Sequence, residues 1–95
     1  MMIAMYETEY SDHIIKVFKK LRKKNPKQMR IIAKKIDEII INPHRYKNLR
    51  KPLQHCKRIH IDDSFVLVYS VDEKNKIVKI KDYDHHDNIY KKRIP

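Results

Sequence analysis

Apolar residues in the first half of the chain recur at the spacing of helices. Two such stretches, residues 10–21 and residues 29–40, have lysine and arginine in most of the remaining positions. This period places the apolar side chains on one stripe of each helix. The two stripes comprise Tyr10, Ile14, Val17, Phe18 and Leu21, then Met29, Ile32, Ala33, Ile36, Ile39 and Ile40.

Capping residues indicate where these helices begin and end. Thr8 is the expected N-cap of the first helix. Asn25, which a proline follows, separates the two helices and caps the second, and Gln28 is expected to reach back to that cap. Asn42, again before a proline, ends the second helix. The stretch therefore predicts an antiparallel helical hairpin.

The period changes to two in the second half of the chain. Residues 58–61 alternate polar and apolar, residues 65–71 form a nearly continuous apolar run, and residues 77–83 alternate again. These segments predict strands, the middle one buried on both faces. Residues 2–7 predict a first strand, and residues 85–93 a short C-terminal helix.

The order β-α-α-β-β-β predicts one α+β domain that spans residues 1–95. The N-terminal helical hairpin can bury its stripes only against one face of a small, mainly antiparallel sheet. If Ile59, Ile61, Val78 and Ile80 face the helices, the other face should be open. By alternation, that open face carries Arg58, His60, Lys79 and Lys81.

Charge and cysteine content indicate which classes of partner and which cellular compartment to expect. The chain has 23 Lys and Arg against 12 Asp and Glu, a formal charge of +11, which favours nucleic acid or an acidic protein as partner. One cysteine, Cys56, allows no disulfide within the chain and fits a reducing cytoplasm. The apolar start is too short for a signal peptide or a membrane span, so we expect no membrane partner.

The segment KDYDHHDNIY, residues 81–90, concentrates imidazoles and acids in a basic chain. Histidine suits proton transfer, because an ordinary imidazole pKa of about 6.5 leaves both forms accessible near neutral pH. Adjacent residues point apart, so we do not expect His85 and His86 to act together. With Asp84 and Asp87 they form a donor set that suits zinc or manganese. They are contiguous and match no known ligand spacing, so we expect no metal and no cofactor.

Four segments, LRKPL, KRIHIDDSFVLVY, VKIKDY and HHDNIY, follow one another in the second half of the chain. With the two helices and the chain length, they resemble the RelE/ParE superfamily of toxins from toxin–antitoxin systems. The resemblance covers essentially the whole chain and is most specific over residues 49–90. It implies the fold described above. RelE-type and YafQ-type members are ribosome-dependent mRNA endonucleases, whereas the ParE branch poisons DNA gyrase.

The RelE-type pattern matches this chain unevenly. Two basic residues of that pattern are matched by Arg58 and His60, and its catalytic tyrosine by Tyr90. Where the pattern has two further arginines, this chain has Val66 and Asp84.

The YafQ-type pattern, which uses histidines, fits better. Its histidine in a C-x-x-x-H-I stretch is matched by His60, and the one four residues before the final aromatic residue by His86. An aspartate in the turn is matched by Asp62 or Asp63, and an upstream histidine by His55.

The resemblance implies RNA cleavage by the 2′-hydroxyl of the substrate, without metal. His86 is then the general acid, His60 the general base or a phosphate contact, and Arg58 the clamp on the scissile phosphate. Tyr90 stacks on a base or orients the hydroxyl. Flanking phosphates are expected at Arg50, Lys51, Lys57, Lys79 and Lys81. Further candidates are His55, Asp63 and His85.

The resemblance also implies partners. They are an acidic, RelB-like antitoxin in a hetero-oligomer and mRNA on the ribosome. Two alternatives remain open: a ParE-like inhibitor of gyrase without nuclease activity, and a catalytically inactive basic module that binds RNA through the same sheet face.

Overall fold

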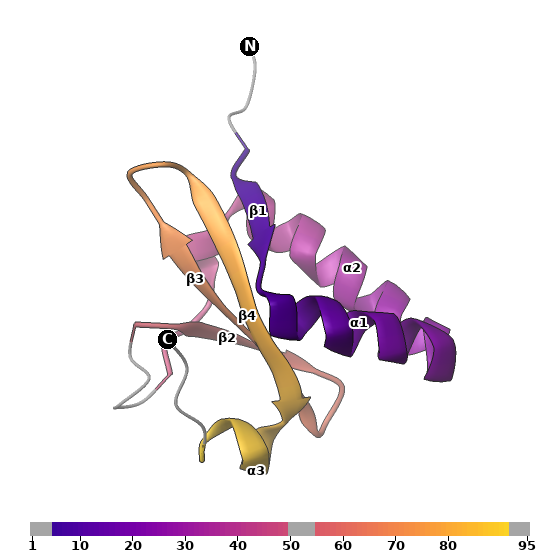
Figure 1. The fold of residues 1–95 in the computed structure, drawn as a ribbon. Coiled ribbons are helices and arrows are strands. Elements are labelled where there is room, and N and C mark those ends of the chain that lie inside the picture. Colours follow the sequence, from indigo (N-terminus) through magenta and orange to yellow (C-terminus); the bar gives the residue numbers. More distant parts are fainter. Residues whose placement is uncertain (1–4, 50–54, 92–95) are drawn as a thin grey trace.

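The computed structural model describes residues 5–49 and 55–91, and Figure 1 shows how their helices and strands are arranged. The elements are β1 (Glu7–Tyr10), α1 (Asp12–Lys24), α2 (Pro26–Ile41), the 3-10 turn η1 (Pro43–Arg45), β2 (Lys57–Ile61), β3 (Phe65–Asp72), β4 (Ile77–His85) and α3 (His86–Ile89). The predicted α+β order, with a helical hairpin and a short C-terminal helix, is confirmed.

The strands of the described residues form one sheet in the order β1-β4-β3-β2. β3 pairs antiparallel with both β2 and β4, while β1 pairs parallel with β4. Parallel strands need a long connection, and the connection from β1 to β4 begins with the helical hairpin. Figure 1 shows α1 and α2 side by side on one face of this sheet, with α3 at the end of β4.

The start of α1 differs from the prediction. Ser11 caps the helix: its hydroxyl oxygen accepts a hydrogen bond from the N–H three residues on, at 3.1 Å. Thr8, the predicted cap, lies in β1 opposite Val78. The strand expected over residues 2–7, of which residues 2–4 lie outside the described part, is therefore displaced toward the C-terminus, and Tyr10 belongs to it. Pairing with β4 has overridden the local capping signal.

Asn25 separates and caps the helices as predicted. Its side-chain oxygen accepts a hydrogen bond from the Gln28 N–H at 3.1 Å. The Gln28 side chain, however, does not reach back to the cap. It is buried where α2 meets the sheet, and its amide donates to the Tyr83 hydroxyl at 3.1 Å. A buried amide needs a partner, and β4 provides it. The predicted end of α2 at Asn42 is confirmed.

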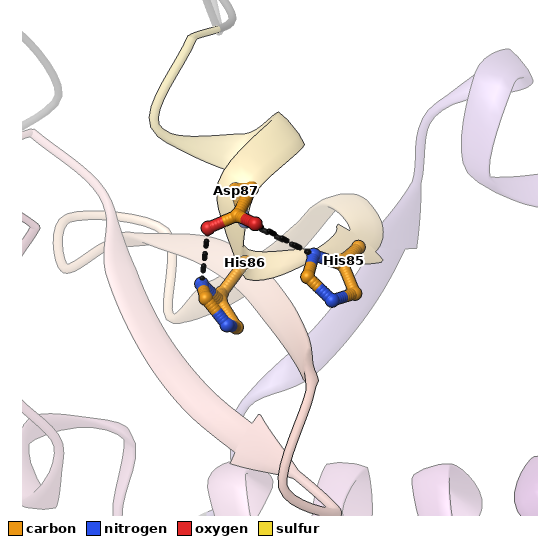
Figure 2. Close-up of side chains that lie close together, drawn as sticks. All are labelled: His85, His86 and Asp87. Carbon is orange, nitrogen blue, oxygen red and sulfur yellow. Dashed lines mark hydrogen bonds and ion pairs between the residues drawn. The ribbon is translucent and has the colours of Figure 1, made fainter.

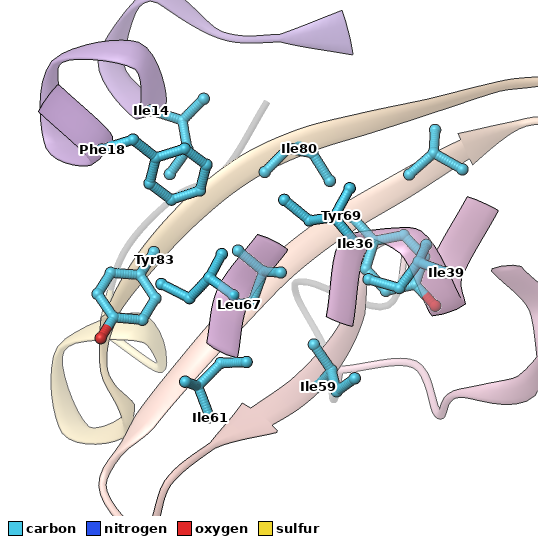
Figure 3. Close-up of a cluster of buried hydrophobic side chains, with 12 residues drawn as sticks. Ile14, Phe18, Ile36, Ile39, Ile59, Ile61, Leu67, Tyr69, Ile80 and Tyr83 are labelled. Carbon is cyan, nitrogen blue, oxygen red and sulfur yellow. The ribbon is translucent and has the colours of Figure 1, made fainter. Parts of the chain in front are cut away.

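The main core lies between the helical hairpin and one sheet face (Figure 3). Its buried members are Ile14, Phe18, Ile32, Ile36, Ile39, Ile59, Ile61, Leu67, Tyr69, Val78, Ile80 and Tyr83. The four strand residues predicted to face the helices are among them. Tyr69 is fully buried, and its hydroxyl donates to the Pro43 carbonyl at 2.7 Å, which fixes η1 against β3. In the described part of the chain, no helix has both the length and the apolar character that crossing a membrane requires.

The opposite sheet face is not open throughout, which corrects the prediction. A second buried cluster lies on it, formed by Leu49, Cys56, Val66, Val68 and Ile89. β3 carries apolar side chains on both faces, so its outer face also needs cover. α3 supplies that cover through Ile89. Polar and charged groups are left at the margins of the face, on β2 and β4.

The turn between β3 and β4 carries a carboxylate that joins distant parts of the chain. Glu73 accepts a hydrogen bond from the Tyr6 hydroxyl at 2.8 Å and lies 2.7 Å from His44 Nε2. It also pairs with Lys76 in the same turn. The hydrogen bonds from Lys76, Tyr6 and His44, in that order, lower the pKa of Glu73 from 4.5 to about 2.

Replacing Glu73 with glutamine is expected to change how stability depends on pH in acid. The pKa of Glu73 is lower in the folded chain, so its contribution is present above the ordinary value of 4.5 and is lost as pH falls toward about 2. The free energy of unfolding should therefore fall more steeply over this window in the wild type than in Glu73→Gln. Urea unfolding at a series of pH values measures it, with Glu7→Gln, an exposed strand carboxylate, as control. Equal slopes in all three proteins would contradict the assignment.

Candidate functional site

The junction between β4 and α3 is fixed by hydrogen bonds. The His86 N–H donates to the Ser64 carbonyl at 2.9 Å, which ties the start of α3 to the β2–β3 turn. Asp84 accepts hydrogen bonds from the His85 N–H at 2.7 Å and from the Asn88 amide at 3.2 Å. The two histidines thus project from a braced strand-to-helix turn.

Both imidazoles lie on the same side of this turn (Figure 2). The rings of His85 and His86 are stacked, with centroids 4.5 Å apart and an angle of 29° between planes. Asp87 contacts both: one carboxylate oxygen is 2.9 Å from His86 Nδ1, and the other is 3.7 Å from His85 Nδ1. The expectation that adjacent histidines point apart is wrong here, because the backbone changes from strand to helix between them.

The His86 ring is oriented by Asp87. Its Nδ1 lies 2.9 Å from a carboxylate oxygen of Asp87, and this contact leaves Nε2 available to give or take a proton. Figure 2 shows that nitrogen on the side of the ring away from Asp87. The side chain is 41% exposed, so a substrate can reach it.

The same three side chains are also the candidate metal ligands. One donor atom each from His85, His86 and Asp87 can be chosen so that all lie within 4.8 Å of one another. Two imidazoles and a carboxylate suit zinc or manganese. Asp84, the fourth residue of the expected set, is not part of this group. Contacts of the Asp87 carboxylate with the two imidazoles, at 2.9 Å from His86 Nδ1 and 3.7 Å from His85 Nδ1, hold the three side chains together.

Arg58 and His60 meet on β2. Arg58 Nη1 lies 2.5 Å from His60 Nε2, and the two residues pair with Val68 and Val66 on β3. Both valines belong to the second cluster. Arg58 and His60 are thus on the sheet face away from the helical hairpin, as alternation predicted. His60 is exposed and Arg58 half-buried.

Val66 and Asp84, where the RelE-type pattern has arginines, lie in one row with His60. Val66 on β3 pairs with His60 on β2 and with Asp84 on β4. Val66 is fully buried in the second cluster, beneath Ile89. The Asp84 carboxylate accepts a hydrogen bond from the His85 N–H, just before α3. The middle of the face is therefore apolar, and its cations stand at the margins.

The remaining predicted residues are less closely gathered. Lys79 and Lys81 lie on β4, and the Lys81 charge is near the Cys56 thiol, whose pKa is raised mainly by burial. Lys57 is committed to structure: its ammonium donates to the Tyr46 carbonyl at 3.0 Å and to Asn48 at 2.9 Å. Its prediction as a phosphate contact is therefore not supported by its geometry.

Other candidates stand at the surface or beyond the described residues. Tyr90 is 47% exposed at the end of α3. His55 and Asp63 are exposed. Arg50 and Lys51, both predicted to hold phosphates, lie outside the described residues.

The described residues also line two hollows. One, of about 370 Å³, lies between α1 and α2, with an apolar lining that includes Ile15 and Phe18 and with Lys19 and Arg22 also lining it. The other, of about 400 Å³, lies at the outer edge of β2, where Arg58 and His60 form part of its lining. Its other basic residues come from α2 and from residues 45–47. Residues 44–56, which supply Arg45 and Lys47, are basic in composition, but composition alone does not predict a hollow.

Comparison with known proteins agrees with this architecture. The family model described as ParE toxin of type II toxin-antitoxin system, parDE, matches residues 5–90. The chain is 56% identical over 89 residues to a protein named "Putative toxin RelE4" from Methanocaldococcus jannaschii, covering 94% of this chain and 95% of that one.

Two solved structures share the fold. A free-state mutant of the Escherichia coli toxin RelE superposes with a TM-score of 0.74 at 20% identity, covering 93% of each chain. A chain of the toxin-antitoxin complex RelBE2 from Mycobacterium tuberculosis has a TM-score of 0.73 at 20% identity, covering 86% of this chain and 99% of that one. With its strand order, its helical hairpin and a family match over nearly its whole length, the chain belongs to the RelE/ParE superfamily of toxins from type II toxin–antitoxin systems.

Proposed function

We propose that this toxin is a ribosome-dependent endonuclease that cleaves mRNA without a metal ion. The observation that carries the proposal is the His86–Asp87 pair, with a nitrogen-to-oxygen distance of 2.9 Å. It stands at the start of α3, which packs over the sheet face that bears Arg58 and His60. Proton-transfer groups and fixed cations on one face are what cleavage of an RNA phosphodiester requires.

In the proposed reaction, the 2′-oxygen of the RNA bonds to the adjacent phosphorus and the bond from phosphorus to the 5′-oxygen breaks. His60 takes the proton of the 2′-hydroxyl, and protonated His86 supplies the proton that the departing 5′-oxygen needs. The products are a 2′,3′-cyclic phosphate and a 5′-hydroxyl. Arg58 stabilises the charge that develops on the phosphate oxygens.

The contact between Arg58 and His60 involves the nitrogen that would act as the base. A guanidinium has only N–H groups to offer, so His60 Nε2 is the acceptor in this contact. A phosphate is a stronger partner for a guanidinium than a neutral imidazole is. An RNA phosphate that draws Arg58 away therefore frees the Nε2 lone pair for the 2′-hydroxyl. On this proposal, binding of the substrate prepares the base.

Tyr90 is the fourth proposed member of the site. Its ring, half exposed after α3, stacks on a base, and its hydroxyl orients a group of the scissile nucleotide.

Removing only the Tyr90 hydroxyl is expected to matter. Tyr90→Phe keeps the ring but loses one hydrogen bond to a charged transition state, which costs about 10- to 100-fold in cleavage rate. Growth arrest on expression should weaken or disappear. Tyr10→Phe, at an exposed tyrosine on β1, should remain fully toxic. Full toxicity of Tyr90→Phe would show that the hydroxyl is not needed and would leave Tyr90 only the stacking role.

A second candidate function is inhibition of DNA gyrase. It is favoured by Val66 and Asp84, which leave the middle of the face without cations. A supercoiling assay with purified gyrase separates the two functions. Inhibition by wild type and His86→Ala alike, without RNA cleavage, would favour gyrase.

We further propose that an acidic antitoxin neutralises the toxin by laying an amphipathic helix in the hollow between α1 and α2. The hollow is mainly apolar, its charged lining residues are Lys19, Arg22 and Asp37, and the chain carries a charge of +11. An apolar stripe flanked by acids is complementary to that surface. The RelBE2 relative, whose structure is a toxin-antitoxin complex, supports such a partner.

An aspartate in this hollow should weaken the complex. Ile15→Asp removes an apolar contact and adds a charge that repels an acidic helix, so affinity for the antitoxin that copurifies with the wild-type chain should fall at least about tenfold. Titration calorimetry measures it. The matched control is Ile41→Asp, because Ile41 is more exposed than Ile15 and lies outside the hollow. Equal effects of both variants would place the antitoxin elsewhere.

A further inference from the structure

The hollow at the outer edge of β2 gathers cations from four separate elements. Its lining includes Lys35 from α2, Arg45 from η1, Lys47 from the following loop and Arg58 from β2. Its volume of about 400 Å³ lies in the range of small-ligand sites. Its described lining residues include no acid, and one carboxylate beside it, Glu38, lies 3.5 Å from Lys35 Nζ. Four cations against this single carboxylate leave the concave surface positively charged.

The walls of this hollow are tied together. The Arg58 N–H donates to the Lys47 carbonyl at 3.1 Å, and the Leu49 N–H to the Cys56 carbonyl at 2.9 Å, so the loop adds a short pairing beside β2. The Lys57 ammonium also holds this loop, because it donates a hydrogen bond to the Tyr46 carbonyl. A site whose walls are held in advance loses little freedom when it binds.

An aromatic ring accompanies the cations. Tyr46 lines the hollow, and the guanidinium of Arg45 lies 5.7 Å from the centroid of its ring. The Tyr46 hydroxyl donates to Glu38 at 3.3 Å, which holds the ring against α2. Fixed cations beside an aromatic ring and a guanidinium are the elements that bind single-stranded nucleic acid, by phosphate contact and base stacking.

The hollow is continuous with the candidate site, because Arg58 and His60 belong to both. We propose that it holds the single-stranded RNA on one side of the scissile phosphate, with Lys35 and Lys47 on flanking phosphates and a base stacked at Tyr46 and Arg45. The inference rests on the proposed function in taking RNA as the substrate. It adds residues outside the catalytic set and gives the RNA a path, from the Arg58 margin of the sheet toward α2.

RNA affinity of charge-matched variants tests the proposal. The probe is a fluorescent single-stranded RNA of about ten nucleotides, 2′-O-methylated so that it cannot be cleaved, and the protein is the full chain. Lys35→Ala/Lys47→Ala is compared with Lys16→Ala/Lys23→Ala, which removes the same charge from the exposed face of α1. The variant in the hollow, Lys35→Ala/Lys47→Ala (the groove pair), should weaken RNA binding about tenfold or more. It should also reduce the slope of log affinity against log salt by about 1.4, for two phosphate contacts on a single strand. The α1 pair should change affinity less than about threefold.

Each outcome decides the question. Equal losses from both pairs would mean general charge attraction and overturn the groove. Loss of binding to a poly-glutamate peptide, with RNA binding unchanged, would assign the groove to an acidic protein and also overturn it. The same experiments test the proposed nuclease function separately from the proposed RNA path. If the wild type cuts translated mRNA while the groove pair binds RNA normally, only the groove fails. If the groove pair loses RNA binding but the wild type cuts nothing, the proposed nuclease fails and the groove stands.

Discussion

His86→Ala is expected to slow RNA cleavage by about 10²- to 10⁴-fold, the usual contribution of a positioned general acid. The imidazole is fixed by Asp87 at 2.9 Å and its other nitrogen is free to meet the substrate. Alanine supplies no proton, so the 5′-oxygen would have to leave as an alkoxide or take its proton from water. Growth arrest should disappear with the activity. Single-turnover cleavage in a reconstituted translation reaction measures the loss.

The loss should not come from unfolding. α3 is held by the buried side chain of Ile89 and by the backbone bond from His86 to Ser64, neither of which the substitution removes. His85→Ala is the control: it removes the stacked neighbour and the ring nitrogen that accepts from the Asp87 N–H, and it leaves the His86–Asp87 ion pair. It should cost less than about tenfold. A His86→Ala protein that folds and cuts at the wild-type rate would remove His86 from the mechanism.

Arg58→Ala is expected to slow cleavage by about 10²- to 10³-fold, the typical cost of losing one preorganised donor to transition-state charge. Arg58 is the cation next to the proposed base, and in this fold Val66 and Asp84 provide no substitute. Arg58→Lys should recover only part of the rate, because an ammonium keeps the charge but loses the bidentate geometry. The rate at saturating RNA measures catalysis separately from binding.

Arg30→Ala is the control for the loss of one positive charge in Arg58→Ala. Arg30 is exposed on α2 and lines neither hollow, so its removal should leave the cleavage rate unchanged. If Arg30→Ala and Arg58→Ala slow cleavage equally, the effect is one of total charge and the proposed clamp is wrong.

Much of the fold follows from periodicity. The helical stripes, the cap at Asn25 and the three C-terminal strands were predicted because each depends on local pattern and backbone preference. The first strand was predicted too early in the chain and the start of α1 was misplaced, because parallel pairing of β1 with β4 joins residues about seventy positions apart. The bond from Gln28 to Tyr83 was missed for the same reason.

The candidate site was predicted in part. Alternation placed Arg58 and His60 on the correct face because β2 is regular. It failed for His85 and His86, whose rings stack only because strand becomes helix between them. The apolar cover of β3 and the basic hollow at β2 arise from tertiary packing of Leu49, Cys56 and residues 45–47, which no local pattern encodes.

Primer extension on an mRNA during translation, with wild-type toxin and His86→Ala side by side, tests ribosome-dependent cleavage and the role of His86 together. The wild type should cut at codon positions only when ribosomes are present, and His86→Ala at matched concentration should not cut. Uncut mRNA with both proteins, or equal cutting by both, would contradict this expectation.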